Sequence, residues 1–237
     1  MRRLALAALL GVGLGAGVAH ADQWTDPNGR LTFNKPSGWQ AEAAGPQTSQ
    51  TVVLLFNASN DCYVFGLPNP GTANSSPDAA RNTTDPLTPD AWVTAASAVR
   101  DFFPSGTTPQ LVSQTVDTSG FWPVQRAQLQ GGGKTVFGAV QVRPGFEMRA
   151  FCASTSGGES PGFAQIFNSL GHPNDATWQA EAQQQVSDRE ARAAAAAAAA
   201  EAAAAEQSNS QAQPEADGVD DGVARTSRDP RARRRRD

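Results

Sequence analysis

Residues 158–162 are the first candidates for chemistry, because they hold a serine at the spacing of a known class of nucleophile. Gly158-Glu159-Ser160-Pro161-Gly162 matches the G-x-S-x-G pattern, in which a serine nucleophile sits between a strand and a helix. That arrangement needs a backbone N–H from the residue after the serine, and Pro161 has none. His172 is the one base available to it, yet no Asp or Glu lies between Ser160 and His172 to complete a triad. We therefore expect no catalytic residues and interpret Ser160 as the N-cap of a helix.

The first 21 residues have the three-part layout of a secretory signal peptide. Met1-Arg2-Arg3 supplies positive charge, residues 4–18 are apolar and uncharged, and Ala19-His20-Ala21 leads to a cleavage site at Ala21/Asp22. The mature chain would begin with Asp22, not with the cysteine that carries the lipid of a lipoprotein. No later stretch is apolar for long enough to span a bilayer. We expect a periplasmic or secreted protein without a transmembrane segment.

Cys62 and Cys152 are the only cysteines. Secretion would place them in an oxidising compartment, where an even count favours a disulfide bond. Closing a loop of about 90 residues contributes ~4 kcal/mol in the chain-entropy model, less any strain. Two buried free thiols are the alternative. Because the one histidine left after removal of residues 1–21 and two distant cysteines cannot supply a closed zinc site, we expect neither a metal nor a cofactor.

The tryptophans are candidates for a carbohydrate-stacking surface. We interpret Trp39 and Trp92 as core residues, whereas Trp24 and Trp122 lie next to predicted turns and are the candidates for exposure. Arg81 is a further candidate ligand-binding residue. It lies in segment 67–87, a long connection without a pattern of its own, of a kind that is often functional.

The net charge of the chain argues against a nucleic acid as its partner. The formal net charge is −4 and the pI is about 5.2, so the chain as a whole has no strong basic field. Positive charge is concentrated only at the end of the chain, where an anionic lipid or another polyanion is a candidate partner. A solvated tail without a partner is the alternative. These terminal arginines are Arg231, Arg233, Arg234, Arg235 and Arg236.

The elements that would position these residues are mostly strands. Turn residues divide the chain into short strands at 31–33 and after Trp39, a hairpin of 51–56 with 62–65, and an antiparallel meander of 111–116, 121–129, 135–142 and 146–153. One helix is expected from Thr88 as N-cap to Phe103, and a second over residues 161–170. Residues 174–206 are strongly helical by propensity, but their apolar residues are almost all alanines.

Two motifs within this order of elements resemble a known family. Phe33-Asn34-Lys35-Pro36-Ser37-Gly38-Trp39 resembles the Phe-x-x-Pro-x-Gly-Trp opening of Mog1/PsbP-like domains, which include secreted DcrB-like bacterial proteins. Ile166-Phe167-Asn168-Ser169-Leu170 is similar to the terminal helix of that family. The resemblance covers about residues 22–172. It implies an α+β sandwich, in which helices flank an antiparallel sheet, and an accessory or binding role without catalysis.

The sequence thus predicts four parts. They are a signal peptide at 1–21, an α+β globular domain at 22–173, an alanine-rich helix at 174–206 and a disordered basic tail at 207–237. The leading hypothesis is a secreted, non-enzymatic accessory or binding protein of the bacterial cell envelope. The alternatives are a glycan-binding module that uses exposed tryptophans and a hydrolase that uses the charged residues Asp78, Arg81 and Asp85.

Overall fold

The structure is a computed structural model that describes residues 22–43, 49–82, 85–99 and 101–211, with side chains up to residue 208. The predicted signal peptide and the arginine cluster at residues 231–236 lie outside these ranges. Contacts group the chain into two units, Met1–Val186 and Ser187–Asp237.

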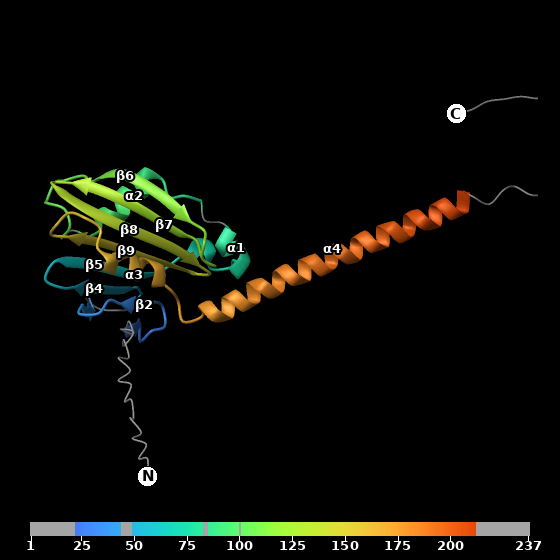
Figure 1. Cartoon of the computed structure of the whole chain (residues 1–237), viewed down its shortest axis with the longest axis horizontal. Helices are drawn as coiled ribbons and strands as arrows, with labels where there is room; N and C mark the ends of the chain where they lie inside the picture. Colours follow the sequence, from blue (N-terminus) through green and yellow to red (C-terminus); the bar gives the residue numbers. More distant parts are fainter. Residues whose placement is uncertain (1–21, 44–48, 83–84, 100, 212–237) are drawn as a thin grey trace, which may run out of the picture. The chain divides into compact units, whose positions relative to one another are not determined.

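The first unit is built on a seven-stranded sheet in which every neighbouring pair is antiparallel (Figure 1). Its strand order is β3-β4-β5-β9-β8-β7-β6, so the meander β6 to β9 is joined to the hairpin β4–β5 through the pair β5–β9. The hairpin and the four-stranded meander are both as predicted. The strands are β3 (Gln40–Ala43), β4 (Thr51–Phe56), β5 (Asn60–Pro68), β6 (Gln110–Asp117), β7 (Val124–Gly131), β8 (Lys134–Arg143) and β9 (Phe146–Ser154).

A separate two-stranded hairpin, β1 (Asp22–Thr25) and β2 (Thr32–Lys35), lies against this sheet. Asp26 attaches this hairpin to β4, because its Oδ2 accepts a hydrogen bond from the Thr51 hydroxyl at 2.6 Å. The same oxygen accepts a hydrogen bond from Arg30 Nε at 3.1 Å. Burial alone would raise the pKa of Asp26, but the hydrogen bonds from Thr51 and Arg30 outweigh it and lower the pKa.

Each face of the sheet carries its own apolar core, since successive side chains of a strand point to opposite faces. On β9, Ala150 and Cys152 belong to the core under α3 (Pro161–Ser169), whereas Phe151 belongs to the core under α2 (Pro89–Ser97). The sheet thus has helices on both faces, and the predicted α+β class with an antiparallel sheet is confirmed.

Helix α2 is shorter than predicted. Thr88 caps it by accepting a hydrogen bond from the Ala91 N–H at 3.2 Å, as expected, but it ends at Ser97 and does not reach Phe103. Both Phe102 and Phe103 are buried in the same core. Consecutive helical residues point about 100° apart, so a continued helix would have turned one of the two rings away from the sheet.

Segment 67–87 is not the unstructured connection that the sequence suggested. Strand β5 continues to Pro68, and two short helices follow, the 3-10 helix η1 (Pro70–Thr72) and α1 (Pro77–Asn82). The Thr72 hydroxyl donates to the Arg143 carbonyl at 2.8 Å, so this segment is fixed to the end of β8.

Helix α4 (Asp175–Gln211) extends past the expected end at Glu206. In the first unit, Ala182 is buried. The second unit, over its residues 187–211, consists of the rest of α4, and all of its described side chains are exposed. Over the ranges that the structure covers, no helix combines the length and hydropathy needed to cross a membrane.

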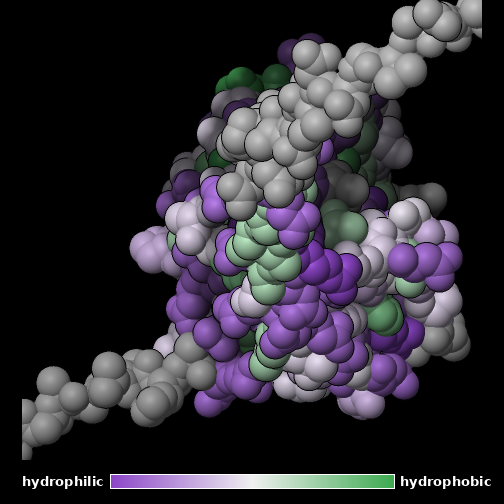
Figure 2. Space-filling model, turned by 90° about the vertical axis from the view of Figure 1, so that its right-hand side faces the viewer, coloured by the Kyte–Doolittle hydropathy of each residue, from purple (hydrophilic) through white to green (hydrophobic). Residues whose placement is uncertain are grey.

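The face shown in Figure 2 is mostly hydrophilic or intermediate in hydropathy (purple and white), and its hydrophobic atoms (green) lie in small separate groups.

Candidate functional site

The first unit contains a cavity with a volume of about 570 Å³. Four segments that are distant in sequence line it: the connection from β6 to β7, the end of β8, the connection from α3 to α4, and the hairpin β1–β2. We call it the polar cavity, because carboxylate, amide, hydroxyl and guanidinium groups outnumber its aromatic rings. Its polar and aromatic lining comprises Gln23, Thr32, Asp117, Ser119, Phe121, Trp122, Gln141, Arg143, Asn168, Ser169, His172 and Asp175.

Arg143 forms the floor of the polar cavity, with only 1% of its surface exposed. Its Nε and Nη2 donate to the two carboxylate oxygens of Asp175 at 2.7 and 3.1 Å, and Nη2 also donates to Gln141 Oε1 at 2.7 Å. Burial lowers the pKa of Arg143, and Asp175 counteracts this. A bidentate pair of this kind joins β8 to the first turn of α4 and leaves the floor close to neutral.

Trp122 lies over this guanidinium, whose Cζ is 4.3 Å from the centre of the indole ring. Trp178, from the start of α4, packs edge-on against Trp122 with 6.4 Å between ring centroids. Only 8% of Trp122 is exposed, so the expectation of an exposed Trp122 is wrong. The neighbouring turn alone suggested exposure, but Arg143 and α4 cover the ring from two sides.

His172 is wedged between Phe146 and Trp178, with 4.5 Å from its ring centroid to each. Its Nδ1 accepts a hydrogen bond from the Asn174 N–H at 3.1 Å, which fixes the neutral ring as the Nε2–H tautomer. Burial lowers the pKa of His172; the Asp175 carboxylate opposes this shift and the Arg143 charge adds to it. His172 is therefore a neutral packing residue that helps to seat the start of α4.

The rim of the polar cavity carries the groups that could contact a ligand. Asp117 accepts a hydrogen bond from the Ser119 N–H at 2.9 Å, and the hydrogen bonds with Ser119 lower its pKa, so it is ionised at neutral pH. Phe121 is half-buried beside it. The Arg81 guanidinium lies 4.9 Å from the centre of the Phe121 ring, which brings one predicted ligand-binding residue to the edge of the cavity.

The other candidate, Trp24, does not line this cavity. It is half-buried and stacks on Phe33, with 5.0 Å between ring centroids and 17° between planes. The two residues are paired across the hairpin β1–β2, and both pack into the core under α3. Trp24 and Trp122 thus lie in different environments and do not form one stacking face.

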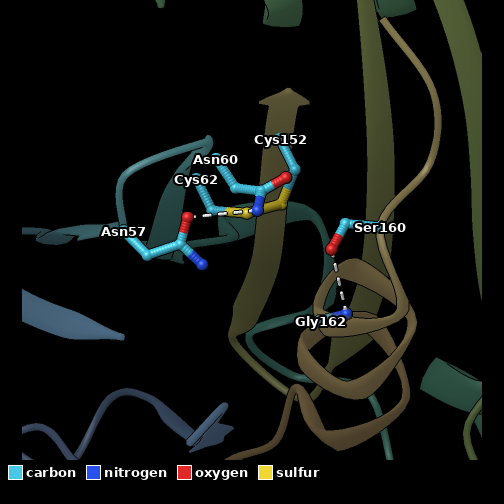
Figure 3. The surroundings of a disulfide bond; sticks show 6 residues. All are labelled: Asn57, Asn60, Cys62, Cys152, Ser160 and Gly162. Carbon is cyan, nitrogen blue, oxygen red and sulfur yellow. Dashed lines mark hydrogen bonds between the residues drawn. A yellow bond between two sulfur atoms is a disulfide. The ribbon is translucent and has the colours of Figure 1, made fainter. Parts of the chain in front are cut away.

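Ser160 is the N-cap of α3, as the sequence predicts. Its Oγ accepts a hydrogen bond from the Gly162 N–H at 3.4 Å, and Pro161 occupies the first helical position (Figure 3). His172 follows the other end of this nine-residue helix, which has a rise of about 13 Å along its axis. A helix of that length keeps the two side chains apart, so they cannot act as a nucleophile and its base.

Cys62 and Cys152 form a disulfide bond between directly paired positions of β5 and β9 (Figure 3). Both residues are fully buried in the core under α3. At the start of β5, Asn57 Oδ1 accepts a hydrogen bond from Asn60 Nδ2 at 3.1 Å and closes the turn from β4. The bond therefore joins the hairpin to the meander, as expected from the sequence. It belongs to the framework of the fold and not to the polar cavity.

The described ranges contain no candidate metal site, because no three His, Cys, Asp or Glu side chains are grouped closely enough there to hold an ion. The hydroxyl of Ser169, which lines the polar cavity, donates to the Gln165 carbonyl at 2.7 Å and accepts from the Asn34 N–H at 2.8 Å. It is thus engaged with the backbone. What the cavity offers is hydrogen bonding and aromatic contact at its rim, over a floor of paired charges.

No family model matches this chain, and no curated protein matches its sequence. Among solved structures, the chain is similar to the solution structure of cyanobacterial PsbP (CyanoP) from Synechocystis, with a TM-score of 0.44 and 12% identity over 69% of this chain and 98% of that one. It is also similar to a protein from Bacteroides thetaiotaomicron, with a TM-score of 0.39 and 12% identity over 66% of this chain and 50% of that one. These similarities concern the fold alone.

Proposed function

We propose that the chain is a secreted, non-enzymatic binding protein of the bacterial cell envelope and that the polar cavity is its ligand site. The observation that carries this proposal is the pairing of the buried charges beneath the rim. Arg143 and Asp175 satisfy each other; His172 accepts a hydrogen bond at Nδ1, and its Nε2 is buried with no hydrogen-bond partner among the described residues. Groups held in this way position a surface for contact, whereas a catalytic acid or base must be able to exchange a proton with the substrate.

The disulfide supports secretion. Disulfide bonds form and persist in oxidising compartments, and the N-terminal sequence has the layout of a signal peptide.

The rim favours an uncharged, hydroxyl-rich ligand such as an envelope glycan. Phe121 supplies an apolar ring, and the side chains of Asp117, Gln23 and Asn168 supply planar hydrogen-bonding groups around the same cavity. Sites for polar small molecules combine aromatic area with a few fixed polar groups in this way. Arg81 supports the Phe121 ring from outside the cavity.

Titration of the mature, oxidised protein with a soluble N-acetylglucosamine oligomer tests this proposal. Because Trp122 and Trp178 pack at the cavity, we expect saturable quenching of their fluorescence. Phe121→Ala should weaken binding by about fivefold, since an aromatic contact contributes about 1 kcal/mol.

Phe56→Ala is the matched control, because Phe56 is a half-buried phenylalanine of β4 that does not line the cavity. Equal affinities of both variants and the wild type would contradict the site. Labelling of Ser160 by an activity-based serine hydrolase probe would contradict the non-enzymatic role.

A further inference from the structure

Strand β6 forms one end of the seven-stranded sheet, and over the described chain no strand pairs with its outer edge. Six of its eight residues are exposed. They include Val112 and Val116, which are 53% and 38% exposed and are the exposed large hydrophobic residues found within the described ranges. This face of the molecule therefore combines open backbone groups with apolar surface, the two features that allow another strand to add.

The sequence of β6 does little to prevent such pairing. Natural edge strands are usually short or carry Lys, Pro or inward-pointing charges. The strand at the opposite end, β3, has four residues and includes Glu42, whereas β6 has eight residues, and Asp117 is its one charged residue. A single irregularity, the register shift between Leu111 and Ser113, interrupts it near its start. After this shift the strand is regular, with the uncharged residues 113–116 followed by Asp117.

We propose that β6 pairs with β6 of a second copy of this chain, antiparallel and centred on Thr115, so that two sheets become continuous. In this register, Thr115 faces Thr115 of the second copy, Gln114 faces its Val116, and Ser113 faces its Asp117. The side chains of each pair lie on the same face of the joined sheet, as antiparallel pairing requires.

The contacts of β6 with β7 show which face each residue uses. Thr115 is paired with Arg126, whose guanidinium lies over the Phe167 ring on the α3 side. Gln114 is paired with Ala127, which belongs to the core on the α2 side. Val116 shares the face of Gln114, because it is two residues further along the strand.

Charge and side-chain chemistry favour a second copy as the occupant. The proposed register opposes no two like charges, and it lets the Ser113 hydroxyl donate a hydrogen bond to the Asp117 carboxylate twice, once in each direction. Paired threonines are a favourable cross-strand combination. The two-fold axis lies midway between the two Thr115 residues. Because each copy uses up its open β6 edge in this contact, the assembly stops at a dimer.

Analytical ultracentrifugation of the mature, oxidised protein over a hundredfold range of concentration tests the proposal. We expect a reversible equilibrium between monomer and dimer. Thr115→Lys places two ammonium groups opposite each other at the two-fold axis and should weaken dimerisation by about tenfold. Thr115→Glu should weaken it less, because each glutamate also lies opposite Arg126 of its own chain, which offsets part of the repulsion. An equimolar mixture of the two variants should recover the dimer, since the lysine then faces a glutamate.

Ala43→Lys is the matched control, because it adds the same charge at an exposed position of β3, the opposite edge strand. It should dimerise like the wild type. Circular dichroism and a thermal melt of each variant establish that it is folded. A wild type that stays monomeric at every concentration, a Thr115→Lys variant that dimerises as well as the control, or a mixture that does not recover would each overturn the proposal.

Discussion

The disulfide bond should account for a large part of the stability of the first unit. Cys62 and Cys152 are 90 residues apart, and closing a loop of that length in the unfolded chain corresponds to about 4.6 kcal/mol in the chain-entropy model. The double variant Cys62→Ala/Cys152→Ala should lose about this free energy of unfolding. For a domain of this size, that corresponds to a fall in Tm of about 9–18 °C.

Urea unfolding followed by tryptophan fluorescence measures the change. The m-value should rise in the double variant, because an unfolded chain without the cross-link exposes more surface. Val64→Ala is the matched control, since Val64 is buried in the same core on the same strand and its loss leaves the cross-link intact. It should lower the midpoint without changing m. A loss below about 2 kcal/mol with an unchanged m-value would refute the reasoning.

Three further predictions concern the Arg143–Asp175 pair, Gly138 and His172. Asp175→Asn removes the charge that pairs with buried Arg143, and it should cost about 2 kcal/mol in urea unfolding, below the usual value for a buried pair because 26% of the Asp175 side chain is exposed. Gly138→Ala would place a Cβ 2.9 Å from the Trp92 ring, so it should cost about 2 kcal/mol and change the near-UV circular dichroism. Because the folded pKa of His172 lies below 6.5, the unfolded chain binds this proton first as the pH falls. The free energy of unfolding should therefore decrease as the pH falls below about 6.5, and this slope should diminish in His172→Gln; an unchanged slope would contradict the assignment.

Elements with explicit local signals could be predicted from the sequence. The turn between β7 and β8 is an example, because Gly132 and Gly133 have positive φ angles of 56° and 76°, which glycine adopts without strain. The caps Thr88 and Ser160 likewise act within their own helices. Helix α1 also has a local cap, because the Ser76 hydroxyl accepts a hydrogen bond from the Ala79 N–H at 3.2 Å. The helix was not predicted, because the surrounding Pro and Asn residues are typical of loops.

The polar cavity could not be predicted in the same way. Arg143 and Asp175 are 32 residues apart and meet only because α4 starts beside the end of β8. Trp122 is buried for the same reason, since the residues that cover it come from other elements. Arg81 was identified for its charge, whereas its partner, the Phe121 ring, depends on where α1 packs.

Two-dimensional ¹H–¹⁵N NMR spectra of the mature, oxidised protein, recorded while an envelope glycan oligomer is added, show directly whether the polar cavity binds a ligand. We predict saturable shifts concentrated in residues 117–124 and 168–175, which form much of the cavity wall. Resonances of β4, which lies outside that wall, should stay in place. Unchanged spectra at saturating glycan, or shifts concentrated away from the cavity, would contradict the account.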